Sequence, residues 1–82
     1  MTRGEAHDVL FAAGFRYCHM ILMGSYDVII YLCQRHGCVE CGVWRTNSAS
    51  KETEEMCLAN TKRAVERALD EVAMHKVLEL CP

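Results

Sequence analysis

The six apolar residues from Val28 to Cys33 form the longest apolar run in the chain and constrain its fold most strongly. The run is too short for a membrane-spanning helix, which needs about 20 apolar residues. Turn residues bracket it, with Gly24-Ser25 before and His36-Gly37 after. A short run rich in β-branched side chains between turn signals is typical of a strand with two apolar faces. We therefore expect residues 26–34 to form the central strand of a sheet.

The segments on either side predict two further strands and two helices. Large side chains over residues 15–23 and the alternation over residues 39–46 indicate strands. Thr2 followed by Glu5 has the capping-box form, which predicts a first helix ending at Gly14.

A long helix is expected after residues 47–50, where Ser48 or Ser50 can serve as its N-cap. Seven residues at helical spacing predict its buried stripe: Cys57, Thr61, Ala64, Val65, Ala68, Leu69 and Val72. After Met74 the apolar phase breaks, which predicts that the helix ends or kinks near His75. Residues 75–82 would then form a separate tail that docks on a second copy or on a partner.

The predicted fold is α+β, a three-stranded antiparallel sheet with two helices in the order α-β-β-β-α. The chain has 82 residues, of which 51% are hydrophobic and 24% are charged, values that are typical of a globular domain. We expect a single domain over residues 1–82.

A two-residue turn at His36-Gly37 would place Leu32 opposite Cys41 and Ile30 opposite Val43. A three-residue turn would slip this register by one residue and exchange the faces. The two-residue turn predicts a core face made of Val28, Ile30, Leu32, Val39, Cys41 and Val43. It predicts an opposite face made of Ile29, Tyr31, Cys33, Cys38, Glu40 and Trp44.

The chain carries six cysteines, at positions 18, 33, 38, 41, 57 and 81. No signal-peptide pattern precedes them, which favours thiols in a reducing, cytoplasmic compartment; disulfides would require a removed leader. A zinc site is the alternative function of the cluster Cys33, His36, Cys38 and Cys41. In the expected register Cys38 and Cys41 point to opposite faces of the sheet. We therefore favour a thiol-bearing hairpin with no metal and no cofactor.

The element order resembles that of double-stranded RNA-binding domains. Such domains place lysines at the start of their second helix, where they hold phosphates. Here that position reads Ser50-Lys51-Glu52-Thr53-Glu54-Glu55, and the formal net charge is −2. The acidic helix start departs from the pattern, so a nucleic-acid-binding module is kept as the second alternative.

We found no residue cluster that requires catalysis and predict that the chain is not an enzyme. If both helices cover one face, the other face exposes apolar side chains, as protein interfaces do. The predicted partner-binding residues are Ile29, Tyr31, Glu40 and Trp44. The expected function is a non-catalytic, homodimeric protein-interaction module with no membrane association. A small phage or mobile-element inhibitor of a host defence complex, like the anti-CRISPR proteins, fits this size.

Overall fold

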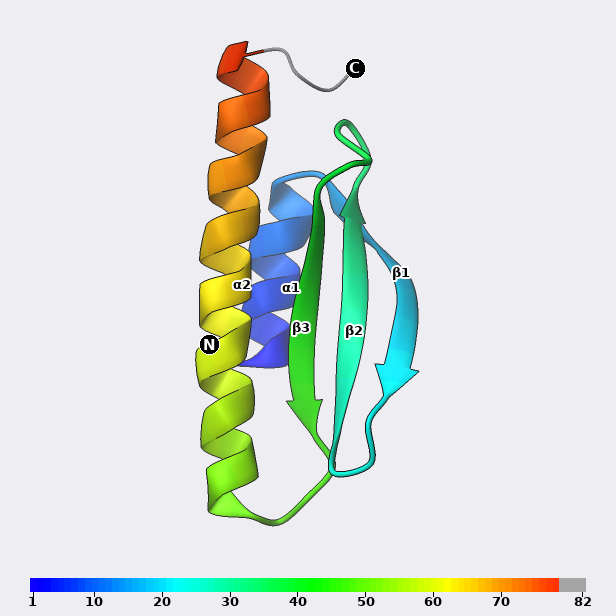
Figure 1. The fold of residues 1–82 in the computed structure, drawn as a ribbon, viewed down its shortest axis with the longest axis vertical. Coiled ribbons are helices and arrows are strands. Elements are labelled where there is room, and N and C mark those ends of the chain that lie inside the picture. Colours follow the sequence, from blue (N-terminus) through cyan, green and yellow to red (C-terminus); the bar gives the residue numbers. More distant parts are fainter. Residues whose placement is uncertain (79–82) are drawn as a thin grey trace.

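The computed structural model describes the backbone of residues 1–78 and the side chains of residues 1–75. The chain forms an α+β fold in the order α-β-β-β-α, which confirms the predicted architecture (Figure 1). Its elements are α1 (Arg3–Ala12), β1 (Phe15–Leu22), β2 (Tyr26–Cys33), β3 (Glu40–Thr46) and α2 (Lys51–Leu78).

Helix α1 begins and ends at the residues that its capping signals predict. The Thr2 hydroxyl accepts a hydrogen bond from the Glu5 amide at 3.2 Å, and the Glu5 carboxylate accepts one from the Thr2 amide at 3.0 Å. Gly14 follows the helix with a φ of 93°, a conformation that costs glycine little. Strand β1 starts at the next residue, Phe15, which is fully buried.

The sheet has the strand order β1-β2-β3, and both strand pairs are antiparallel. The apolar run therefore lies in the central strand, as expected. Both helices pack on one face of the sheet, and α2 runs alongside β3 (Figure 1). The core between them is built from Ala6, Leu10, Phe15, Ile29, Tyr31, Cys33, Val39, Cys41, Val43, Val65 and Ala68.

The predicted hairpin register is wrong by one residue. Tyr31, not Leu32, lies opposite Cys41, and Ile29, not Ile30, lies opposite Val43. The side chains of β2 are therefore exchanged between the faces, whereas those of β3 lie on the faces expected for them. As a result Val28, Ile30 and Leu32 are half-buried on the open face, outside the core.

The longer connection between β2 and β3 explains the slip. The amide of Val39 donates to the His36 carbonyl at 2.8 Å, and the amide of Cys33 donates to the Val39 carbonyl at 3.0 Å. The chain thus turns over residues 34–38 and not over His36-Gly37 alone. This longer loop buries the side chains of both Val39 and His36. The packing of these side chains outweighs the preference of His36-Gly37 for a two-residue turn.

Strand β1 contains a second irregularity, a bulge at Cys18. Tyr17 pairs with Tyr31, but His19 pairs with Ile30, so one residue of β1 is extra. A bulge of this kind reverses which residues point to each face from there on.

Helix α2 begins after Ser50, whose hydroxyl accepts a hydrogen bond from the Thr53 amide at 3.4 Å. The predicted stripe from Cys57 to Val72 is buried or half-buried throughout, which confirms the face that α2 turns to the sheet. The predicted end near His75 is wrong, because the helix continues to Leu78. The rest of the predicted tail, residues 79–82, lies outside the described residues.

Candidate functional site

The structure divides the four predicted partner-binding residues between two faces. Ile29 and Tyr31 are only 5% and 4% exposed and lie beneath the helices, so the prediction that they form an open surface is wrong. The Tyr31 hydroxyl is 2.7 Å from Nδ1 of His7 on α1, and burial raises the pKa of this phenol. Glu40 and Trp44 do lie on the face that the helices leave open.

The open face is apolar along its centre. Val28 of β2 pairs with Trp44, and Ile30 and Leu32 follow on the same side of the strand; all four are half-buried. A Cβ atom on Gly42 would approach Cζ3 of the Trp44 indole to 3.3 Å. The indole can therefore take its position only because residue 42 has no side chain.

A larger apolar surface lies on the edge strand β1, where sequence reasoning had placed no site. It consists of four large side chains of β1 and that of Met23 directly after it, which are between 39% and 72% exposed. We call this set the β1 edge surface: Tyr17, Met20, Ile21, Leu22 and Met23. Because of the bulge, Met20 and Leu22 lie on the helix side of the sheet and Ile21 lies on the open side. The apolar surface therefore wraps around the edge of the strand.

The exposed area of the β1 edge surface is comparable to that of the largest apolar patch on a typical monomer. Aromatic side chains bury roughly 150–250 Å² each and large aliphatic ones somewhat less, so five side chains at these exposures present on the order of 500 Å². The largest apolar patch on a typical monomer is about 300–600 Å² and is often functional. The signal in the sequence was the presence of apolar residues at consecutive positions 20–23, which leaves neither face of this strand polar.

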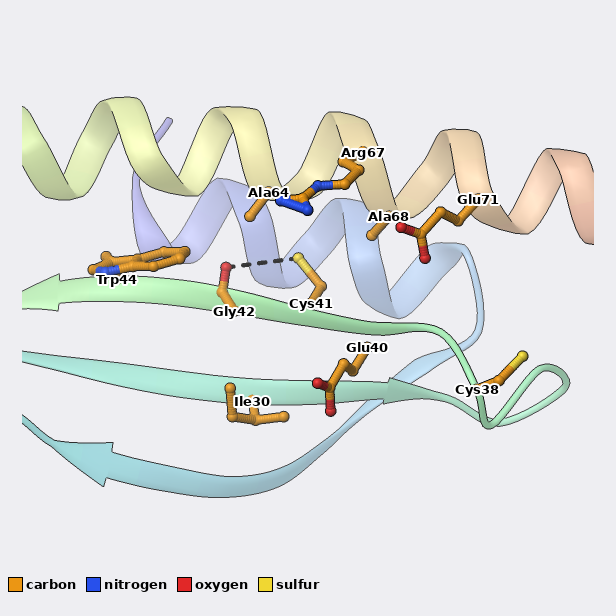
Figure 2. Close-up of a pocket in the computed structure, with 10 residues that line it drawn as sticks. All are labelled: Ile30, Cys38, Glu40, Cys41, Gly42, Trp44, Ala64, Arg67, Ala68 and Glu71. Carbon is orange, nitrogen blue, oxygen red and sulfur yellow. Dashed lines mark hydrogen bonds between the residues drawn. The ribbon is translucent and has the colours of Figure 1, made fainter.

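A groove with a volume of about 390 Å³ lies between β3 and α2 (Figure 2). Arg67 and Glu71 extend from the side of α2 that faces β3, and small side chains keep the groove open between the two elements. The lining residues are Ile30, Cys38, Glu40, Cys41, Gly42, Trp44, Ala64, Arg67, Ala68 and Glu71. The groove combines one cationic group, two carboxylates, an indole and two thiols.

Thr61 of α2 connects the helix to the outer edge of β3 near this groove. Its hydroxyl accepts a hydrogen bond from the Trp44 amide at 2.9 Å and donates one to the Trp44 carbonyl at 3.3 Å. Thr61 is fully buried, so these two bonds replace the strand partner that an edge residue lacks.

The four residues of the zinc alternative do not come together as one site. Cys33 and Cys41 are buried on the helix side, whereas Cys38 is exposed in the loop beyond β2. Burial raises the pKa of the Cys41 thiol to about 11, which keeps it protonated at neutral pH. Among the residues that the structure describes, no three metal-ligating side chains are placed to share an ion.

No helix within the described part of the chain is both long and apolar enough to cross a bilayer. No protein-family model, curated protein or solved structure matches the chain.

Proposed function

We propose that this protein is a non-catalytic protein-interaction module that binds its partner through the β1 edge surface. The observation that carries the proposal is the exposure of five large apolar side chains on one edge strand and the residue directly after it, with Leu22 72% exposed. An apolar edge strand is a template for pairing with another chain, and natural proteins usually protect such edges with charges or proline. The sequence of β1 has no proline, and Arg16 is its only formally charged residue.

The partner that fits this edge best is a second copy of the chain. A twofold axis beside β1 pairs the strand antiparallel with itself, which extends both three-stranded sheets into one of about six strands. In this arrangement Arg16 of one copy lies near the apolar end of the other strand, around Leu22, and away from the second Arg16. The estimated patches of two copies would bury about 1,000 Å² in total, which lies at the small end of specific protein interfaces.

The homodimer would present two open sheet faces, each with Glu40 and Trp44, to a larger protein. Occupying a surface of a host complex, as small phage and mobile-element inhibitors do, is the role we propose for it in a cytoplasmic setting. Nucleic acid is a less suitable partner, because Glu52, Glu54 and Glu55 are exposed in the first turns of α2 and repel phosphate.

Sedimentation equilibrium on the full chain tests this proposal. We expect the wild-type protein to dimerise and Leu22→Lys to shift it to monomer, because a lysine placed there must be desolvated at the interface. Met74→Lys is the matched control, since Met74 is also exposed and apolar but lies on α2. A monomeric wild-type protein at high concentration would refute the dimer, as would equal dissociation by both variants.

A further inference from the structure

The thiol of Cys38 faces an imidazole contributed by a distant part of the chain. Cys38 is exposed in the loop between β2 and β3, and its Sγ lies 3.6 Å from Nε2 of His75 on α2. An imidazole beside a thiol can accept its proton and leave a thiolate, which is the reactive form of cysteine.

His75 is held in place by a second histidine. Its ring stacks on that of His36, with centroids 5.7 Å apart and an angle of 20° between the planes. His36 is only 5% exposed, and its backbone amide donates to Sγ of Cys33 at 3.3 Å. The imidazole that faces Cys38 therefore sits on a buried support.

The ring nitrogens of this pair are unusual for buried groups. Nδ1 of His36 and Nδ1 of His75 are both buried and have no hydrogen-bond partner among the described residues. Buried polar atoms are normally paired, so an exception calls for an explanation such as a chemical role. In the tautomer that carries its proton on Nδ1, the His75 ring turns the lone pair of Nε2 towards the Cys38 thiol.

Cys38 also lies on the groove between β3 and α2, which offers space for a reagent beside the thiol (Figure 2). Arg67 supplies a positive charge in this groove, and Glu40 and Glu71 supply negative charges. A small molecule that carries both carboxylate and ammonium groups is complementary to this set.

We propose that Cys38 undergoes thiol–disulfide exchange with a low-molecular-weight disulfide that carries both carboxylate and ammonium groups. His75 takes the proton of the Cys38 thiol, and the thiolate attacks one sulfur of the disulfide. The new bond joins Cys38 to that sulfur, the old disulfide bond breaks, and the released thiolate takes the proton from His75. One protein thiol and one small disulfide thus give one mixed disulfide and one small thiol.

Cys18 provides an internal control for this reaction. It is also exposed, and its Sγ lies 3.3 Å from Nδ1 of the adjacent His19, but it does not line the groove. His19 itself is exposed and lacks the buried support that His75 has. If exposure and a nearby imidazole were the only requirements, Cys18 and Cys38 would react at the same rate.

The test treats the full chain with oxidised glutathione and follows each cysteine by peptide mass spectrometry. We expect Cys38 to form the mixed disulfide roughly tenfold faster than Cys18 in the wild-type protein. His75→Gln should slow Cys38 and leave Cys18 unchanged, with folding checked by circular dichroism. Equal rates at the two cysteines, or a faster Cys18, would overturn the proposal without any variant.

A second comparison tests the groove. Arg67→Gln should slow the reaction of Cys38 with oxidised glutathione but not with uncharged bis(2-hydroxyethyl) disulfide. Lys62→Gln, an exposed change of the same kind on α2, should alter neither rate. If Arg67→Gln affects both disulfides equally or neither of them, the groove does not bind the reagent and the proposed specificity is wrong.

Discussion

Replacing Thr61 with valine should destabilise the protein more than replacing it with serine, although valine preserves its shape. The hydroxyl forms two hydrogen bonds with the Trp44 backbone, at 2.9 and 3.3 Å, in a fully buried position. A buried polar group left without its partner costs about 1–3 kcal/mol. In Thr61→Val both the amide and the carbonyl of Trp44 lose their partner at a partly buried edge. We therefore expect the free energy of unfolding to fall by roughly 2–3 kcal/mol. Thr61→Ser keeps both bonds and loses one methyl group, a loss of about 1 kcal/mol.

Urea unfolding monitored by fluorescence measures the difference, because Trp44 is the only tryptophan in the chain. Threonine, valine and serine have similar helix propensities, so the comparison isolates the hydroxyl and the methyl group. Thr53→Val is the control on the same helix. Thr53 bonds to Ser50 through its backbone amide, which the substitution keeps. We therefore expect the free energy of unfolding to change by less than about 0.5 kcal/mol. If Thr61→Val is as stable as Thr61→Ser or more stable, the hydroxyl does not hold α2 to the edge of β3.

Two further predictions concern side-chain contacts between β2 and β3. A Cβ on Gly42 would meet Cγ1 of Val28 at 3.1 Å and the Trp44 ring at 3.3 Å. Gly42→Ala should therefore displace the indole and red-shift its fluorescence emission. An unchanged emission spectrum would show that the indole does not pack against residue 42. Asp27 accepts a hydrogen bond from Arg45 at 2.6 Å, which holds the pKa of its carboxyl below the usual 3.8, with a smaller contribution from Asn47. A lowered pKa in the folded state stabilises the protein above the ordinary value, and this contribution is lost as the pH falls through the lowered one. Urea midpoints at pH 5 and pH 3 should therefore fall less in Asp27→Asn than in wild type, and equal falls would contradict the pairing.

The elements of the fold could be predicted from local signals in the sequence. The helix ends are set by local contacts: the capping box of Thr2 and Glu5, the left-handed conformation of Gly14 and the cap at Ser50. Each acts within one turn of a helix, so residues close in the sequence are enough to predict it. The buried stripe of α2 follows from helical spacing alone.

The hairpin register and the candidate surface could not be predicted in the same way. The loop over residues 34–38 forms because His36 and Val39 gain burial against distant elements, which no local turn rule includes. Because the register differs by one residue, Ile29 and Tyr31 point to the helix side of the sheet and not to the open face on which they were expected. The bulge at Cys18 likewise has no marker in the sequence, so the side of the sheet to which Met20 and Leu22 point became visible only in the structure.

Backbone hydrogen exchange of β1 as a function of protein concentration tests the pairing of two edge strands most directly. If two copies pair along this edge, alternate amides of Phe15–Leu22 become protected when the concentration rises, since each new ladder bond uses an outward-facing N–H. Amides of β2, which is already paired on both sides, should show no such dependence. Exchange from the outward-facing amides of β1 that stays fast at every concentration would contradict the proposed interface.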